Sequence, residues 1–304
     1  MRKILFIIAI IASIMALASV KNSFAQTGEG GEAGAFLKNG YGARASAMSN
    51  TFTAIANDVS SIFYNPAGLS SNQKLQFMGM YSNLYGNMNG VNYGNFGVSK
   101  GFQSGTFGLG VIYSKVSDIP YVTSLSGPDG STFSDNETAF YLSYSRAVTE
   151  NVRVGANLKL ISHTLADASA TGFGADIGVL AKFNEQFAGG LVLQDIVPPK
   201  ISLGSRSDSY PGKIKFGIAY KVIPALTISP EMNYTFDKSV QFTGGAEYNV
   251  YKDIITLRGG YNSVSTSPSF GVGINYMDVH LDYSYNVNKD LGAVNKFGFV
   301  ISLK

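Results

Sequence analysis

After the first quarter of the chain, apolar and polar residues alternate along most of the sequence. In the stretch 171–184, Phe173 and Ile177 share one face, and Asp176 and Lys182 share the other. A β-strand places successive side chains on opposite faces, whereas a helix scatters alternate residues around its axis. The alternation therefore predicts β-strands over most of the chain.

Runs of this kind recur about fourteen times, which is within the range of known membrane barrels. Their approximate bounds are 74–84, 91–101, 104–116, 137–148, 151–164, 171–184, 186–196, 212–222, 225–236, 240–250, 253–264, 268–277, 278–287 and 293–303. An even number of antiparallel strands lets a barrel close with both chain ends on one side. The predicted fold class is therefore all-β, a transmembrane antiparallel β-barrel of about 14 strands.

The connections between these runs support the same fold. Alternate connections are tight, such as 102–103 and 223–224, and the intervening ones are longer on the whole. Two of the longer ones, 117–136 and 197–210, are predicted loops. Short periplasmic turns and longer external loops are typical of outer-membrane barrels. A soluble β-sandwich shares the residue alternation, but it does not explain this sorting of the loops.

The segment that precedes the strands follows a different pattern. Five residues recur at three-to-four spacing, which predicts one short amphipathic helix: Ala45, Met48, Phe52, Ile55 and Ala56. The sequence Asn-Pro-Ala-Gly at 65–68 favours a turn. We interpret residues 26–73 as an N-terminal hatch or plug and residues 74–304 as the barrel. Glycines on the polar strand faces leave space in the lumen for such a plug.

Residues 1–25 have the pattern of a secretory signal peptide. Arg2 and Lys3 precede an apolar run at 4–20, and Ser23-Phe24-Ala25 fits a cleavage site. The alternative is an N-terminal membrane anchor, because the run is near spanning length. A cleaved signal followed by a barrel predicts the outer membrane of a Gram-negative bacterium, with membrane lipid as a partner.

Composition narrows the classes of function. Charged residues make up 14%, below the roughly 25% of soluble domains. The signal peptide holds three of the 23 basic residues, so the mature chain has as many basic as acidic residues. A neutral mature chain without a basic cluster predicts no nucleic-acid partner. The absence of cysteine excludes thiol catalysis, iron–sulfur clusters and cysteine zinc sites.

The sequence contains no catalytic set. His280, Asp282 and Ser284 share one strand face, but neighbours two apart on a strand lie about 7 Å apart, too far for a hydrolase triad. The other histidine, His163, lies near an external loop. Acidic residues between 118 and 137 do not have the spacing of a calcium loop. We therefore predict a protein that is not an enzyme and that needs no cofactor or metal.

Several charged or ionisable residues occupy polar-face positions within strands. A charge there is costly toward lipid and tolerated toward the lumen. The residues predicted to face the lumen are Lys159, Asp176, Lys182, Lys215, Arg258, His280 and Asp282. They could line a pathway or pin the plug by ion pairs. The mixed signs of a neutral mature chain suggest no ion selectivity and favour pinning.

Three stretches of the hatch and four of the barrel carry a resemblance to a known family. They are Gly42–Met48, Phe52–Asp58, Ile62–Leu69, Gly190–Ile196, Gly244–Tyr248, Leu257–Tyr261 and Leu281–Tyr285. The chain resembles the PorV/PorQ family of outer-membrane proteins, and its hatch looks like that of FadL-type fatty-acid transporters. The resemblance implies a fourteen-stranded FadL-like barrel. It marks as the hatch motif Arg44, Asn65, Pro66, Ala67 and Gly68, and Asn65 and Pro66 favour a structural turn over ligand contact.

The resemblance implies two possible functions. PorV-like members serve type IX secretion in Bacteroidota by receiving cargo C-terminal domains from the translocon. FadL-like members pass hydrophobic molecules such as fatty acids and hydrocarbons through a lateral opening. We favour an accessory or cargo-handling role in secretion, with the channel as the alternative. The secretion role predicts exposed docking residues in the external loops, namely Tyr121, Leu125, Phe133, Ile201 and Leu203. The channel predicts an apolar path beside the hatch.

Overall fold

The computed structural model describes residues 33–84, 90–122, 127–204, 206–236, 238, 240–252, 254–288 and 292–303. The predicted signal peptide and Leu125 lie outside these ranges. In the described part of the chain, no helix is both long and apolar enough to cross a membrane.

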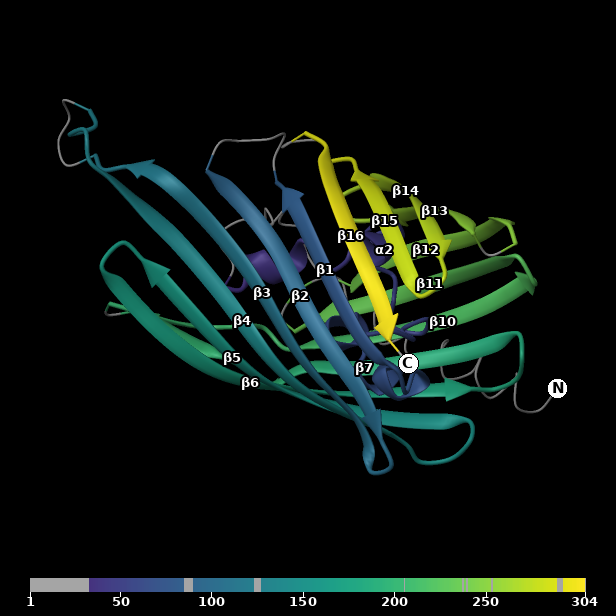
Figure 1. Cartoon of the computed structure of the whole chain (residues 1–304). Helices are drawn as coiled ribbons and strands as arrows, with labels where there is room; N and C mark the ends of the chain where they lie inside the picture. Colours follow the sequence, from purple (N-terminus) through teal and green to yellow (C-terminus); the bar gives the residue numbers. More distant parts are fainter. Residues whose placement is uncertain are drawn as a thin grey trace.

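Fourteen antiparallel strands form one closed barrel, which confirms the predicted fold class (Figure 1). Each strand pairs with its neighbour in the chain, apart from an inserted hairpin after β7, and β1 pairs with β16 to close the wall. The strands are β1 (Leu75–Asn83), β2 (Val91–Phe102), β3 (Gly105–Pro120), β4 (Thr132–Ala147), β5 (Val152–Leu165), β6 (Ala168–Lys182), β7 (Phe187–Val197), β10 (Lys213–Ile223), β11 (Leu226–Thr235), β12 (Val240–Tyr251), β13 (Ile255–Asn262), β14 (Ser267–Tyr276), β15 (Val279–Asn286) and β16 (Val294–Leu303).

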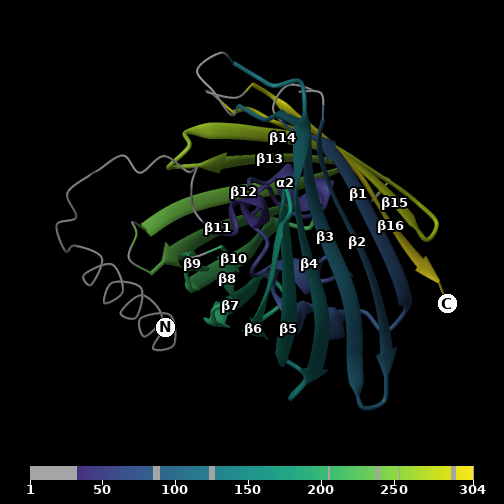
Figure 2. The same ribbon diagram turned by 90° about the vertical axis from the view of Figure 1, so that its left-hand side faces the viewer.

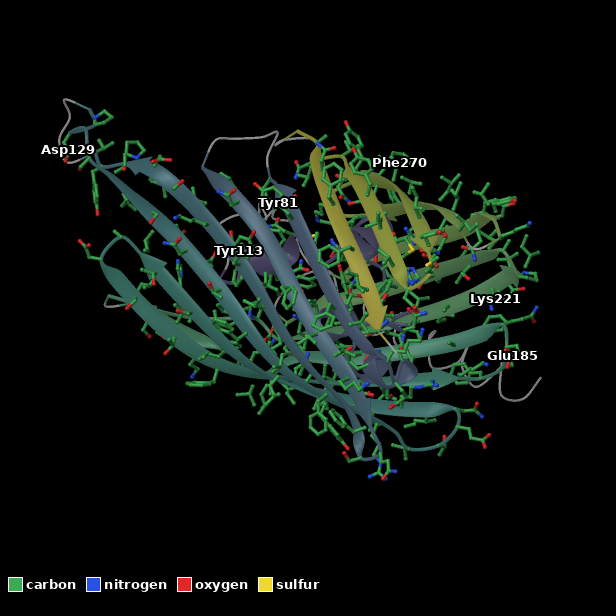
Figure 3. The ribbon with its side chains drawn as sticks, viewed as in Figure 1. Tyr81, Tyr113, Asp129, Glu185, Lys221 and Phe270 are labelled. Carbon is green, nitrogen blue, oxygen red and sulfur yellow. The ribbon has the colours of Figure 1, made fainter. Side chains whose placement is uncertain are left out.

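The two faces of the wall differ as the alternation predicts. On β5, Leu158 is 63% exposed and its neighbour Lys159 is 2% exposed. Aromatic residues such as Tyr81, Tyr113 and Phe270 lie on the outer surface (Figure 3). Apolar side chains cover the outside and polar ones line the inside, which is the pattern expected of a transmembrane barrel.

The two ends of the barrel differ in their connections. Tight turns lie at the end marked by Glu185 and Lys221, and the β3–β4 hairpin with Asp129 projects from the opposite end (Figure 3). Short turns belong to the periplasmic side of outer-membrane barrels. We therefore call the end with Glu185 the periplasmic end.

Both ends of the predicted loop 117–136 are strand. β3 continues to Pro120 and β4 begins at Thr132, with a bulge after Val116 where Asp118 has φ +61°. Beyond the lipid, neither strand face needs apolar residues, so the alternation that marks a strand disappears although backbone pairing continues. The result is a hairpin that extends past the rim (Figure 1).

The predicted loop 197–210 contains a second hairpin, made of β8 (Lys200–Leu203) and β9 (Arg206–Ser209). It lies inside the barrel against β6. Pro198 and Pro199 precede it and have no N–H to donate to a ladder. The chain therefore leaves the wall after β7 and returns at β10.

Residues 33–73 lie within the lumen, and we call them the hatch segment (Figures 1 and 2). It contains four short helices, η1 (Ala35–Lys38), α2 (Ala43–Ser46), α3 (Ser61–Tyr64) and η2 (Pro66–Ser71). The predicted single helix around 45–56 is wrong. Ser49 and Asn50 both have positive φ, which ends the helical turn, and Met48, Phe52 and Ala56 are buried in a shared core rather than on one helix face.

Candidate functional site

Glycines of the wall form the seat of the hatch segment. A Cβ atom at Gly155 of β5 would lie 2.4 Å from backbone atoms of Pro66 and Ala67. A Cβ at Gly190 of β7 would lie 2.2 Å from the carbonyl oxygen of Thr53. No side chain fits in these gaps, so the backbone of the hatch rests directly on the backbone of the wall.

Asn65 fixes the hatch segment to β6. Its Nδ2 atom donates to the carbonyl oxygens of Thr53 (2.8 Å) and Val179 (3.1 Å). Its Oδ1 atom accepts from the backbone N–H of Ala67 (3.2 Å) and so caps η2, which begins at Pro66. The side chain is fully buried, and all three bonds are structural.

We expect Asn65→Asp to destabilise the protein, because a carboxylate would face two carbonyl oxygens and lose both donated bonds. Each buried polar group left unpaired costs about 1–3 kcal/mol. Asn136→Ala, in the projecting hairpin, is the control and should change the urea midpoint little. Circular dichroism would follow unfolding. An Asn65→Asp midpoint equal to the control would contradict the assigned bonds.

Arg44 of α2 fixes the opposite side of the hatch segment. It forms a fork with Glu247 of β12, with Nε to Oε2 at 3.0 Å and Nη2 to Oε1 at 3.1 Å. Its Nη1 atom also contacts Asp58 at 3.0 Å. Burial lowers the pKa of Arg44, but Glu247 and Asp58 raise it by more, so it keeps its charge.

The ion pairs continue along the wall. Glu247 also accepts from Nε of Arg258 at 2.6 Å, and Nη1 of Arg258 donates to Asp282 at 2.6 Å. A cavity of about 270 Å³ opens beside this network at the periplasmic end. His280 lines it, with Nδ1 at 2.6 Å from Oδ1 of Asn275.

A second charged cluster lies on the other side of the lumen. Nζ of Lys159 is 2.7 Å from Oδ1 of Asp176 and also contacts the carboxylate of Asp195. All three side chains are almost fully buried. This cluster joins β5, β6 and β7, so it connects wall to wall rather than wall to hatch.

The remaining predicted lumen charges lie elsewhere. Lys182 pairs with Glu185 at an exposed periplasmic turn. Lys215 of β10 shares a face with Gly217, whose Cβ would lie 3.3 Å from Cβ of Thr53. Lys215 therefore faces the lumen above this part of the hatch segment. Arg44 forms two ion pairs: the pair with Glu247 joins the hatch segment to the wall, and the pair with Asp58 lies within the hatch segment.

Sequence reasoning missed several residues that hold the hatch segment. Glu231 of β11 accepts from the backbone N–H groups of Phe52 (3.1 Å) and Thr53 (2.9 Å). Lys296 of β16 donates to Oγ of Ser46 (3.0 Å) and to the carbonyl of Asn39. Glu247 was missed as well, and so was Asp195, which pairs within the wall, and all these residues lie on lumen faces. Following the alternation through every strand would have found most of them.

The structure divides the predicted docking residues. Tyr121 and Phe133 lie on the projecting hairpin with ring centroids 4.7 Å apart. The prediction that Ile201 is exposed is wrong, because it is 4% exposed and belongs to the core, and Leu203 packs against that core. The hairpin of β8 and β9 folds inward and buries its apolar residues. Within the described ranges, no group of three or more His, Cys, Asp or Glu side chains could hold a metal ion.

The sequence matches no protein-family model and no curated protein. Solved structures match the fold over most of the chain. The CymD monoaromatic hydrocarbon channel aligns with TM-score 0.66 and 12% identity, over 87% of this chain and 98% of that one. The chain has the fold of outer-membrane channels of this type.

Two further structures agree. The toluene transporter TbuX of Ralstonia pickettii aligns with TM-score 0.65 and 16% identity, over 87% of this chain and 97% of that one. A FadL homologue of Pseudomonas aeruginosa aligns with TM-score 0.59 and 13% identity, over 86% and 97%. These neighbours are channels and transporters rather than enzymes.

Proposed function

We propose that this protein is a non-enzymatic outer-membrane channel for hydrophobic small molecules, which leave the lumen sideways through the wall between β6 and β7. The observation that carries the proposal is an interruption of the wall at this point. The shared fold with hydrocarbon channels supports it. The channel, which was the alternative in the sequence-based prediction, therefore takes precedence over the secretion role.

The interruption lies in the outer half of the barrel. β6 pairs with β5 from Ala168 to Ala181, but with β7 only from Ala175 onward. Residues 168–174 of β6 therefore have no ladder with β7. The cause is in the sequence, because a bulge and then Pro198-Pro199 turn the chain inward.

An apolar interior lies next to this interruption. Buried residues of the hatch segment, β1–β5 and the β8–β9 hairpin form one cluster, which includes Phe36, Tyr41, Met80, Tyr93, Ile112, Ile161, Ile201 and Tyr210. Removing apolar surface from water is favourable by about 25 cal/mol per Å². A hydrophobic molecule that displaced the β8–β9 hairpin would therefore enter a favourable environment.

The direct way to the periplasm is unfavourable for such a molecule. Asn65 is fully buried, and the hatch backbone touches the wall at Gly155 and Gly190. The expected apolar path beside the hatch would have to cross these contacts. On the other side, an apolar solute would displace water from Arg44 and Glu247, and desolvating charges is costly. Sideways exit toward lipid avoids both.

A disulfide that holds the hairpin in place would test this route. A Cβ atom at Gly174 would lie 2.6 Å from Cγ of Pro199, so the pair Gly174→Cys and Pro199→Cys is near bonding distance. We expect oxidised cells to take up toluene at least about tenfold more slowly than reduced cells, or about 1.4 kcal/mol of barrier. Each single cysteine variant is a control. Equal uptake in the oxidised and reduced states would contradict the route.

The secretion role is the second candidate, and the projecting β3–β4 hairpin favours it. This hairpin stands clear of the rim (Figure 1) and carries the paired rings of Tyr121 and Phe133. A pull-down with a tag in this hairpin tests it. Recovery of a large translocon barrel, or of exported proteins that share a C-terminal domain, would support secretion. Recovery of the barrel with lipid or hydrocarbon alone would support the channel.

A further inference from the structure

A chain of buried hydrogen bonds runs from the hatch segment across the wall. The Nδ2 atom of Asn157 donates to the carbonyl oxygen of Ile62 in α3 (2.9 Å) and to Oδ2 of Asp176 (3.0 Å). The Oδ1 atom of Asp176 accepts from the backbone N–H of Asp195 (2.8 Å). Each step is at hydrogen-bond distance. The chain is therefore continuous from the hatch, over β5 and β6, to β7.

This chain ends at the bulge of β7, where the wall is interrupted. The pairs Ile177 with Leu193 and Ala175 with Val197 enclose three residues of β7 but one of β6. Asp195, inside the bulge, has φ +57°. A residue other than glycine adopts this conformation at a cost that its surroundings must offset. The bond from its backbone N–H to Asp176 supplies part of that compensation.

Lys159 extends the chain to the inward-turning segment. It bridges the carboxylates of Asp176 and Asp195. A Cβ at Gly174 would lie 3.2 Å from Cε of Lys159 and 2.6 Å from Cγ of Pro199. Lys159 and Pro199 thus pack at the same glycine, so the network extends to the residue that precedes the β8–β9 hairpin.

We infer that Asn157, Asp176 and Lys159 are positioning residues that couple the hatch segment to the β6–β7 interruption, so that displacing the hatch loosens the β8–β9 hairpin. The inference rests on the proposed function in one respect, namely that the hatch segment and the β8–β9 hairpin can both be displaced. The bonds at the two ends of this hydrogen-bonded series, at Ile62 and at Asp195, do not involve Arg44 or its partners on the far side of the lumen.

The coupling arises because a buried polar network is costly when only some of its hydrogen bonds are made. If the carbonyl of Ile62 moves away, Asn157 loses an acceptor and its hold on Asp176 changes. A buried carboxylate that loses a donor is costly. Asp176 then recovers its bonds by shifting together with Lys159 and Asp195, and that shift moves the bulge.

The test uses a single thiol, because the chain has no cysteine. Ile201→Cys places it on β8, where the side chain is buried. Arg44→Ala loosens the hatch segment from the opposite wall, and Asn157→Leu cuts the polar chain at nearly unchanged size. The readout is the rate of labelling by a water-soluble maleimide in detergent micelles, with no transported ligand present.

We expect Arg44→Ala to raise the labelling rate at least about fivefold, in the range of ordinary coupling energies. In the Asn157→Leu background, Arg44→Ala should raise the labelling rate less than about twofold. Ser145→Ala is the matched control, because Ser145 bonds the hatch at Ala67 (2.9 Å) without leading to the bulge. In that background the full rise should remain.

An equal rise with and without Asn157→Leu would overturn the inference. If Asn157→Leu does not yield a heat-modifiable barrel, Asp176→Asn cuts the same chain at its next member and carries the same expectation. Coupling is reciprocal. The disulfide formed in the double variant Gly174→Cys and Pro199→Cys should therefore also slow tryptic cleavage after Arg44. Labelling and proteolysis need no transport. They can therefore contradict the coupling while toluene uptake supports the proposed route, or support the coupling while uptake contradicts the route.

Discussion

Gly155→Val is expected to prevent the hatch segment from seating in the barrel. The new Cβ would meet backbone atoms of Pro66 and Ala67 at 2.4 Å, and backbone cannot move aside as a flexible side chain can. Overpacking costs about 1–3 kcal/mol, and a backbone clash should reach the upper end. Valine itself favours strands, so any loss comes from the lost seat rather than from β5.

Trypsin reports the seating directly. Lys38 and Arg44 are the only basic residues between positions 33 and 73, so cleavage after Arg44 in a folded barrel means that the hatch has left the wall. We expect cleavage of Gly155→Val at least about tenfold faster, which corresponds to about 1.4 kcal/mol.

The control for this variant is Gly244→Val. Gly244 also lies within a strand, β12, but a Cβ there meets no atom within 4 Å. It should leave the cleavage rate within about twofold, as surface substitutions usually do. Equal protection of Gly155→Val and the control would show that the hatch does not rest on this glycine.

Glu247→Ala is expected to release the α2 side of the hatch segment. Glu247 accepts from both Arg44 and Arg258, so its loss leaves two largely buried guanidinium groups with one carboxylate each. Breaking a buried pair by removing one partner costs about 3–5 kcal/mol. The side chain of Glu247 is partly open to the periplasmic cavity, so we expect the lower end of that range.

The measurements are tryptic cleavage after Arg44 and conductance in a planar bilayer. Both should rise in Glu247→Ala and rise less in Glu247→Gln, which keeps the size and one acceptor. Glu185→Ala removes a different acidic partner, 89% exposed and paired with Lys182. Exposed pairs contribute little, so this control should behave as the unchanged protein. No difference between Glu247→Ala and Glu185→Ala would mean that the Arg44 network does not hold the hatch.

For the charged residues of the site, the sequence predicts which face of the strand they occupy but not which partners they bind. Alternation along β5 and β6 was enough to place Lys159 and Asp176 toward the lumen. It did not show that they pair with Asp195, because Asp195 lies in a bulge where the period of two is interrupted. Pinning of the plug was predicted for the group, whereas among the ion pairs of the described residues it is Arg44, which the family motif marked, that joins hatch and wall.

The sequence alone was enough to predict the barrel, the number of its strands and, apart from the outer ends of β3 and β4, their approximate placement, together with which side of each strand faces outward. These follow from a local rule, because each successive residue faces lipid or lumen in turn. The path of the hatch segment, the inward fold of β8 and β9, and the partners of each buried charge became visible in the folded structure alone. Arg44 and Glu247 are far apart in the chain, and no periodic pattern relates them. Their meeting depends on how the closed barrel brings its wall around the hatch, and that geometry exists only after the fourteen strands have paired.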